Sequence, residues 1–187
     1  MAVKTFTTGE VLTASDTNTY LANSGLVYVA GGALSTNITP FAGCFTSTYR
    51  NYVVKLDNVK VSGAANFWFQ YLNGSTPKTT NYYWDYMGYT TVGTTLNTYT
   101  NGGASTGYTG MDMLAGVPGS CTLDIFDPAV SVQTVAISTS YFYKTNWTYR
   151  TGASHQDDVT TFDGIRFLTD SAVTMTGNVA IYGYRMG

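Results

Sequence analysis

The sequence predicts an all-β protein: an antiparallel, jelly-roll-like β-sandwich with a short N-terminal extended arm and helix. Aromatic residues make up 15% of the chain, which has 16 tyrosines, while only 11% of residues are charged. Aromatic and β-branched side chains fit a pleated surface, and Glu10 is the only glutamate, so a helix-rich fold is unfavourable. Short alternating segments also follow one another too closely to admit crossover helices.

Length and spacing predict a single domain behind a short arm. The chain has 187 residues and no long polar spacer, which is enough to bury a core without metals or several disulfides. We expect an attachment arm over residues 1–25 and a β-sandwich domain over residues 26–187.

The arm combines an extended part with helix signals. Residues 4–12 alternate weakly, and Thr13 or Ser15 can then accept hydrogen bonds from the first turn of a helix. Asp16 lies where the helix dipole favours negative charge. Because a helix of about two to three turns is marginal alone in water, we expect it to dock on another surface.

The first half of the domain alternates clearly. Residues 26–30 form an apolar run, and residues 46–61 predict the first long strand. Residues 66–72 predict the next strand, paired with the first in a hairpin across residues 62–64. Within each of these strands one face is expected to hold the large apolar side chains, namely Tyr52, Val54 and Leu56, then Phe67, Phe69 and Tyr71.

The middle of the chain is less regular. Residues 82–89 predict a strand that is aromatic on both faces. Residues 97–110 are rich in glycine, threonine and serine and predict a long surface loop. Residues 121–126 predict a strand with Cys121 on its apolar face, which ends before Pro128 because proline cannot donate to a ladder.

The last third predicts three further segments and a connection. Residues 130–143 form a long strand or hairpin, residues 144–158 a polar connection, and residues 162–168 and 173–184 a closing pair. About eight strands result, and the alternation leaves open whether they follow jelly-roll or simpler sandwich order.

Charge and hydropathy exclude several classes of partner. The net charge is −2, the pI is near 5.1, and no cluster of Lys or Arg is present to follow a phosphate backbone, so we expect no nucleic acid. No stretch approaches the roughly 18 apolar residues that span a bilayer, so we expect no membrane insertion. The N-terminus lacks the apolar core of a signal peptide.

The titratable residues predict neither a metal centre nor an active site. His155 is the only histidine, and with Asp157 and Asp158 it forms an incomplete ligand set, so a solvated loop is favoured. Calcium stays open, because oxygen ligands from such a loop suit it. No residues can be assigned as base and nucleophile, so we expect no catalytic residue, no cofactor and no enzyme activity.

The two cysteines, Cys44 and Cys121, carry no disulfide framework. In a reducing cytoplasm both are expected to stay reduced and buried.

The aromatic segments are the best candidates for recognition. Rings with a polar tip give a large contact area and can stack on sugars or fill a partner's pocket. The alternative is that alternate rings fill the core of the sandwich while their neighbours pack between subunits, and we expect this of half of them. The candidate contacts with a glycan or a partner are Trp84, Tyr86, Tyr89, Trp147 and Tyr149, and the two tryptophans are expected to be exposed or interfacial.

Residues 6–21 read Phe-Thr-Thr-Gly-Glu-Val-Leu-Thr-Ala-Ser-Asp-Thr-Asn-Thr-Tyr-Leu. This resembles the Phe-Thr-x-Gly-Glu-Val-Leu-Thr-Ala-x-x-x-Asn start of many virion structural proteins of tailed bacteriophages. Residues 45–54, 162–167 and 182–185 look like the β-domain that often follows. The aromatic middle of the chain has no counterpart in this resemblance.

The resemblance implies that the arm attaches the protein to the virion and that the β-domain is an exposed module, usually a homotrimer. The anchors that we expect in the arm are Phe6, Val11, Leu12, Tyr20 and Leu21. The expected location is the virion, assembled in the bacterial host cytoplasm.

Two functions follow as hypotheses. The first is a short tail fibre or appendage subunit that contacts other virion proteins and host-surface glycans. The alternative is a capsid decoration protein, in which the arm clamps the shell and the aromatic faces form trimer contacts. A free carbohydrate-binding module or glycosidase would require an export signal that the sequence lacks.

Overall fold

A computed structural model describes residues 7–11, 13, 25–90, 92 and 96–184 of the chain. Within these residues the protein forms thirteen β-strands and no helix, and every strand pairing is antiparallel. The all-β prediction is confirmed. The predicted N-terminal helix lies almost entirely outside the described residues.

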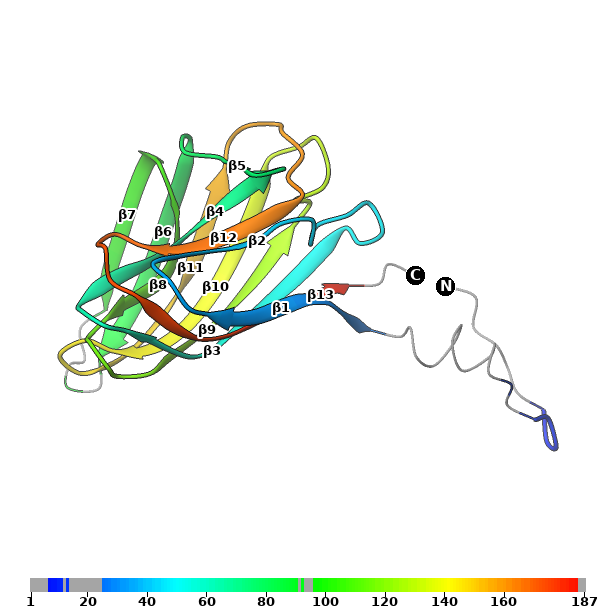
Figure 1. The fold of residues 1–187 in the computed structure, drawn as a ribbon, viewed down its shortest axis with the longest axis horizontal. Coiled ribbons are helices and arrows are strands. Elements are labelled where there is room, and N and C mark those ends of the chain that lie inside the picture. Colours follow the sequence, from blue (N-terminus) through cyan, green and yellow to red (C-terminus); the bar gives the residue numbers. More distant parts are fainter. Residues whose placement is uncertain (1–6, 12, 14–24, 91, 93–95, 185–187) are drawn as a thin grey trace.

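The larger sheet has eight strands in the order β1-β13-β3-β9-β10-β11-β6-β7. Their bounds are Leu26–Leu34 for β1, Met175–Tyr184 for β13, Asn51–Val61 for β3, Gly119–Phe126 for β9, Thr134–Tyr143 for β10, Trp147–Gln156 for β11, Tyr82–Thr90 for β6 and Asn97–Ala104 for β7. Figure 1 shows this sheet running from β7 on one side of the sandwich to β1 on the other.

The smaller sheet has five strands, with β2-β12-β4-β5 in order and β8 paired with β4. Their bounds are Ile38–Phe41 for β2, Gly164–Thr169 for β12, Ala65–Asn73 for β4, Thr76–Pro77 for β5 and Gly107–Met113 for β8. Strands β5 and β8 take different parts of the same β4 edge, at residues 72–73 and 65–69.

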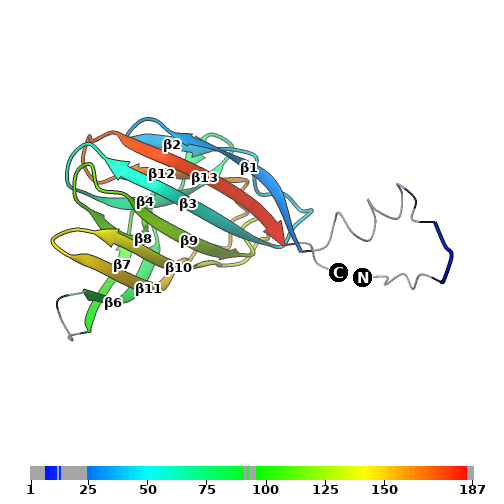
Figure 2. The same cartoon turned by 90° about the horizontal axis from the view of Figure 1, so that it is seen from below.

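One core lies between the two sheets, which face each other in a sandwich-like arrangement (Figure 2). Alternate side chains of β3 and β4 are fully buried in it, as the alternation predicts, and so are those of β9. These residues are Tyr52, Val54, Leu56, Phe67, Phe69, Tyr71, Cys121, Leu123 and Ile125. Both cysteines are free and buried, which confirms that prediction.

The predicted hairpin across residues 62–64 is wrong, and so is the expected pairing of the two closing strands. Strand β3 lies in the larger sheet and β4 in the smaller one, so the turn at residues 62–64 passes from sheet to sheet. Strands β12 and β13 are likewise divided between the sheets. Alternation looks the same in both arrangements, because it reports which face of a strand is buried and not which strand lies beside it.

The predicted surface loop at residues 97–110 is also wrong, since β7 and most of β8 occupy it. Glycine has a packing role here. A Cβ atom on Gly107 would lie 2.3 Å from the ring of Phe69, so only glycine lets β8 pair with β4 at this point.

The predicted polar connection at residues 144–158 contains strand β11, and His155 lies in this strand and not in a loop. The side chains of β11 that point into the protein are polar, and they form hydrogen bonds with backbone groups of neighbouring segments. Ser154 Oγ donates to Tyr108 O at 3.2 Å, and Gln156 Nε2 donates to Thr80 O at 3.0 Å. Hydrophobic alternation therefore could not reveal this strand.

The first residue of β1 and the last residue of β13 lie side by side, because Leu26 pairs with Tyr184 (Figure 1). No helix among the described residues is long and apolar enough to cross a membrane.

Candidate functional site

The outer side of the larger sheet carries a cluster of exposed aromatic rings. Cross-strand register places Tyr141 of β10 opposite Tyr149 of β11, which lies opposite Tyr89 of β6. Their exposed fractions are 47%, 43% and 49%. The Cβ atoms of directly opposed residues on neighbouring strands are about 5 Å apart, so the three tyrosines project from neighbouring positions of the same face.

Trp147 lies beside these tyrosines at the end of the β10–β11 hairpin. Its indole stacks on Tyr141, with ring centroids 5.0 Å apart and planes 3° from parallel. Tyr143 meets the same indole edge-on at 5.6 Å. We call Tyr89, Tyr141, Tyr143, Trp147 and Tyr149 the aromatic face. Because Tyr141, Tyr143 and Trp147 pack on one another, these three side chains have less conformational entropy to lose when a partner binds.

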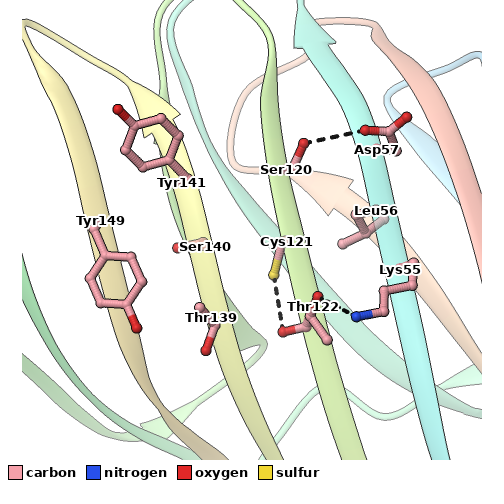
Figure 3. A pocket seen from close by; sticks show the side chains of 10 residues that line it. All are labelled: Lys55, Leu56, Asp57, Ser120, Cys121, Thr122, Thr139, Ser140, Tyr141 and Tyr149. Atoms are coloured by element: carbon pink, nitrogen blue, oxygen red, sulfur yellow. Dashed lines mark hydrogen bonds between the residues drawn. The ribbon is translucent and has the colours of Figure 1, made fainter.

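A shallow hollow of about 440 Å³ adjoins the aromatic face (Figure 3). In Figure 3 Tyr141 and Tyr149 stand on one side of it and Lys55 and Asp57 of β3 on the other. The charged groups have partners on β9: Lys55 Nζ donates to Thr122 Oγ1 at 3.0 Å, and Ser120 Oγ donates to an Asp57 oxygen at 3.4 Å. The hollow therefore has a polar rim against an aromatic wall.

A second hollow, of about 360 Å³, lies on the same side of the sheet over β10, β11, β6 and β7. Met87 and Ile137 line it and are 49% and 46% exposed. Asp85 is the charged residue in its lining. The outer side of these strands is thus a broad surface of tyrosine, threonine and aliphatic side chains with few charges.

The structure brings together three of the five predicted contact residues, Tyr89, Trp147 and Tyr149. Trp84 and Tyr86 lie on the opposite side of β6, because successive side chains of a strand point to opposite faces. Sequence reasoning did not single out Met87 and Ile137. Met87 is two residues from Tyr89 in β6, and Ile137 is four residues from Tyr141 in β10. Residues an even number apart in a strand share a face, and this spacing could have identified them.

Tyr86 does not fit the predicted role of a partner contact. It is 3% exposed, and its hydroxyl donates to Tyr108 O and accepts from Ser138 Oγ at 3.0 Å. Burial raises the pKa of this phenol. Tyr86 is therefore part of the interior.

Trp84 of β6 is half-buried. Its side chain faces the smaller sheet and is therefore not part of the aromatic face. Its ring packs on Tyr108 at 5.1 Å and on Trp68 at 5.8 Å. Its indole nitrogen is buried, with no hydrogen-bond partner in the part of the chain that the structure describes. Sequence reasoning did not single out Trp68, which is half-buried on β4.

Among the predicted anchors of the arm, Val11 is described and is 79% exposed. Phe6, Leu12, Tyr20 and Leu21 lie outside the described residues. The described part of the motif forms a turn, in which Glu10 N donates to Thr7 O at 3.0 Å.

The described residues include no group of three or more His, Cys, Asp or Glu that could hold a metal ion. His155 stacks on Tyr83 with ring centroids 5.0 Å apart. Burial raises the pKa of Cys44 to about 12 and also raises that of Cys121, so both thiols are protonated near neutral pH. What the site offers is a broad contact surface.

No protein-family model matches this chain, and no curated protein sequence matches it.

Proposed function

We propose that this protein is a structural component of a tailed-phage virion, anchored by residues 1–25, with the β-domain as a self-associating tail appendage. The aromatic face carries the assembly part of the proposal. The virion part rests on the resemblance of residues 6–21 to the start of phage structural proteins.

The geometry of the turn at residues 7–10 explains why glycine and glutamate suit positions 9 and 10. Gly9 has a φ of +88°, a left-handed conformation that favours glycine. The Glu10 carboxylate accepts from Thr7 N at 3.1 Å and so closes the turn from its other side. A Thr-x-Gly-Glu sequence is therefore suited to present the following apolar residue, Val11, in a defined direction.

We further propose that the domain is a jelly roll. The order β1-β13-β3-β9 in one sheet and β2-β12-β4-β8 in the other supports this topology. The chain changes sheets at β1–β2, β2–β3, β3–β4, β5–β6, β7–β8, β8–β9, β11–β12 and β12–β13, and this repeated crossing supports two interleaved Greek keys. On this reading β6, β7, β10 and β11 are insertions that widen one sheet and provide the aromatic face.

The occupant that we propose for the aromatic face is a second copy of this chain, in a homotrimer. The aromatic face lies on the outer side of β9, β10, β11, β6 and β7, which are neighbours in the larger sheet. Five strands about 4.8 Å apart, each with about eight residues about 3.4 Å apart, present roughly 650 Å² on that side. A stable interface buries roughly 800 Å² on each partner, with aromatic residues enriched and charges few. The area and composition of this surface are close to those values.

The test is the oligomeric state of the purified protein, measured by sedimentation equilibrium. We expect a trimer that dissociates in Tyr141→Asp and Tyr149→Asp, because a buried unpaired carboxylate costs several kcal/mol. Val159→Asp is the control, since Val159 is 65% exposed and lies outside every strand. A monomeric wild type, or a trimer that survives both aspartates, would refute this interface.

The virion part is tested on purified particles. Quantitative mass spectrometry should find a few to a few tens of copies per particle for a tail appendage, whereas hundreds would indicate capsid decoration. Deletion of residues 1–25 should leave a folded domain that no longer joins the particle. Incorporation of the truncated protein would contradict the attachment role of the arm.

A further inference from the structure

A cleft separate from the aromatic face lies between the smaller sheet and the β6–β7 hairpin. Its volume is about 540 Å³, within the roughly 300–1,000 Å³ typical of ligand sites. Its walls include Trp68 of β4, Trp84 of β6, Asn101 of β7, Ser105 of the β7–β8 turn, and Asp170 after β12. Aromatic and hydrogen-bonding side chains thus line the same space.

The indoles of Trp68 and Trp84 are held in place by one buried tyrosine. Trp68 and Trp84 both pack on the ring of Tyr108, at centroid distances of 4.6 Å and 5.1 Å. Tyr108 is only 4% exposed, and its hydroxyl accepts from Arg150 Nη1 at 2.5 Å. The indole positions are therefore set by the fold before any ligand arrives, which lowers the entropic cost of binding.

The width of the cleft is also set by the fold. Gln70 is 3% exposed, and its side-chain nitrogen donates to Ser105 O at 2.7 Å. Its side-chain oxygen accepts from Arg166 Nε at 2.8 Å. The first bond fastens the β7–β8 turn to β4, and the second holds the Gln70 side chain in place from β12, so the two walls keep their separation.

Asp170 supplies an oriented carboxylate. One oxygen accepts from Asn66 N at 3.0 Å and the other from Asn66 Nδ2 at 2.7 Å. A carboxylate has about four acceptor positions, so acceptor positions remain for a ligand. Because Asp170 is exposed, those positions are open to solvent.

We infer that this cleft binds a neutral saccharide. A sugar ring has an apolar C–H face that suits an indole and a rim of hydroxyls that suits a carboxylate and an amide. Asp170 is the only carboxylate in the described lining of the cleft, and it would repel an acidic sugar. The Arg166 guanidinium that could offset this charge is directed to Gln70.

This site does not depend on the proposed assembly. Trp84 points to the side of β6 opposite to Met87 and Tyr89, so the cleft and the aromatic face can be occupied together. The two proposals can therefore fail separately.

Tryptophan fluorescence and a glycan array test the inference. The chain has three tryptophans, so in Trp147→Phe both remaining indoles line the cleft. We expect saturable binding of at least one neutral trisaccharide among maltotriose, cellotriose and chitotriose, and no binding of trigalacturonate. Affinity should fall about tenfold or more in Asp170→Asn and in Trp68→Ala, since a charge-assisted bond or a ring contact is lost.

Val159→Asp, which lies outside every strand, the aromatic face and the lining of the cleft, is the matched control and should bind as tightly as wild type. Tyr149→Ala then asks whether the aromatic face binds the sugar instead. Asp170→Asn keeps one oxygen that can accept from Asn66 N and loses the acceptor of the Asn66 Nδ2 bond. Thermal unfolding therefore checks that each variant is folded. The inference is overturned if no neutral glycan on the array or in the titrations exceeds the Asp170→Asn signal. Stronger binding of trigalacturonate, or loss of binding only in Tyr149→Ala, would also overturn it.

Discussion

The hydroxyl of Tyr82 accepts a hydrogen bond from the backbone amide of Tyr71 at 2.8 Å, whereas the buried hydroxyl of Tyr71 has no partner among the described residues. The two rings stack with centroids 6.1 Å apart. The bond closes a gap on the β4 edge, because β5 pairs with residues 72–73 and β8 with residues 65–69.

Removing these two hydroxyls should have opposite effects on stability. Tyr71→Phe removes an unsatisfied buried group and should raise the free energy of unfolding by about 1 kcal/mol. Tyr82→Phe leaves the Tyr71 amide without an acceptor and should lower it by about 1–3 kcal/mol. Urea unfolding checks both variants, with unchanged m-values. Shifts of the same sign in both would show that the hydroxyls are not partnered as described.

Alkaline pH should destabilise the protein through its buried tyrosines. Burial raises the pKa of Tyr71, Tyr82, Tyr86 and Tyr108 above the ordinary value near 10. Below pH 10 these phenols are protonated in both states, and their full stability contribution is present. Above pH 10 the unfolded chain releases protons that the folded chain retains. The free energy of unfolding therefore falls as the pH rises from 10 toward the pKa of each tyrosine in the folded state.

The size of this effect can be measured on a single residue. Each such tyrosine lowers the free energy of unfolding by up to about 1.4 kcal/mol per pH unit above its unfolded pKa. Urea unfolding between pH 9 and 11 should therefore show a shallower decline in Tyr71→Phe than in wild type. Equal slopes would mean that Tyr71 ionises in the folded state.

Both thiols should be unreactive in the folded protein. Cys44 and Cys121 are 2% and 3% exposed, and each sulfur donates to a backbone carbonyl, of Phe41 at 3.2 Å and of Thr109 at 3.4 Å. Reactivity needs the exposed thiolate. A colorimetric thiol reagent at pH 8 should detect no thiol in native protein and both in guanidinium chloride. Rapid labelling of native protein would indicate that the sandwich opens locally.

Arg150 should be a strong contributor to stability despite its charge. Its guanidinium lies 4.2 Å from the Tyr99 ring centroid and 5.0 Å from that of Phe142. It also donates to Gly110 O at 3.2 Å. Its Nη2 also lies 3.9 Å from a carboxylate oxygen of Asp112. Arg150→Ala removes this ion pair together with the contacts to the rings and the carbonyl, and should cost about 3–5 kcal/mol in unfolding free energy.

Two variants serve as comparisons for Arg150 in the same urea experiment. Arg150→Lys should recover little of the loss, because an ammonium lacks the planar fork of donors. Arg50→Ala should shift the midpoint far less, since Arg50 pairs with Asp127 on the surface. A small effect of Arg150→Ala would contradict the importance of the buried contacts.

Gly107→Ala should destabilise the domain by about 1–3 kcal/mol, because the added methyl group would overlap the Phe69 ring and overpack the core. Gly32→Ala is the control: its added carbon would lie 3.8 Å from Phe41, an ordinary contact. Thermal unfolding should show a lower midpoint for the first variant and little change for the second. A tolerated alanine at position 107 would mean that β8 can shift on β4.

Strand faces were predictable wherever apolar and polar residues alternate. Tyr52, Val54 and Leu56 share the buried face of β3, as expected. Strand β11 was missed because its inward residues Arg150, Ser154 and Gln156 are polar and bond groups far away in sequence. Side-chain polarity alone cannot distinguish such a strand from a solvated connection.

The candidate site was predictable in part. Tyr89, Trp147 and Tyr149 were singled out for their ring chemistry and lie together on the aromatic face. Alternation separates Trp84 and Tyr86 from Tyr89 within one strand, but only the packing of β8 beneath β6 shows which side is buried. Trp68 joins Trp84 through the pairing of β4 with β8, which no local pattern indicates.

The sequence by itself determined the all-β class, the buried faces of β3, β4 and β9, and the burial of both cysteines. These follow from composition and from the period of two in a strand, which are local properties. Only the tertiary structure decided that β3 and β4 lie in different sheets, that residues 97–110 are strands, and that five aromatic rings meet on one face. These depend on backbone hydrogen bonds between distant segments, and every residue except proline can form such bonds.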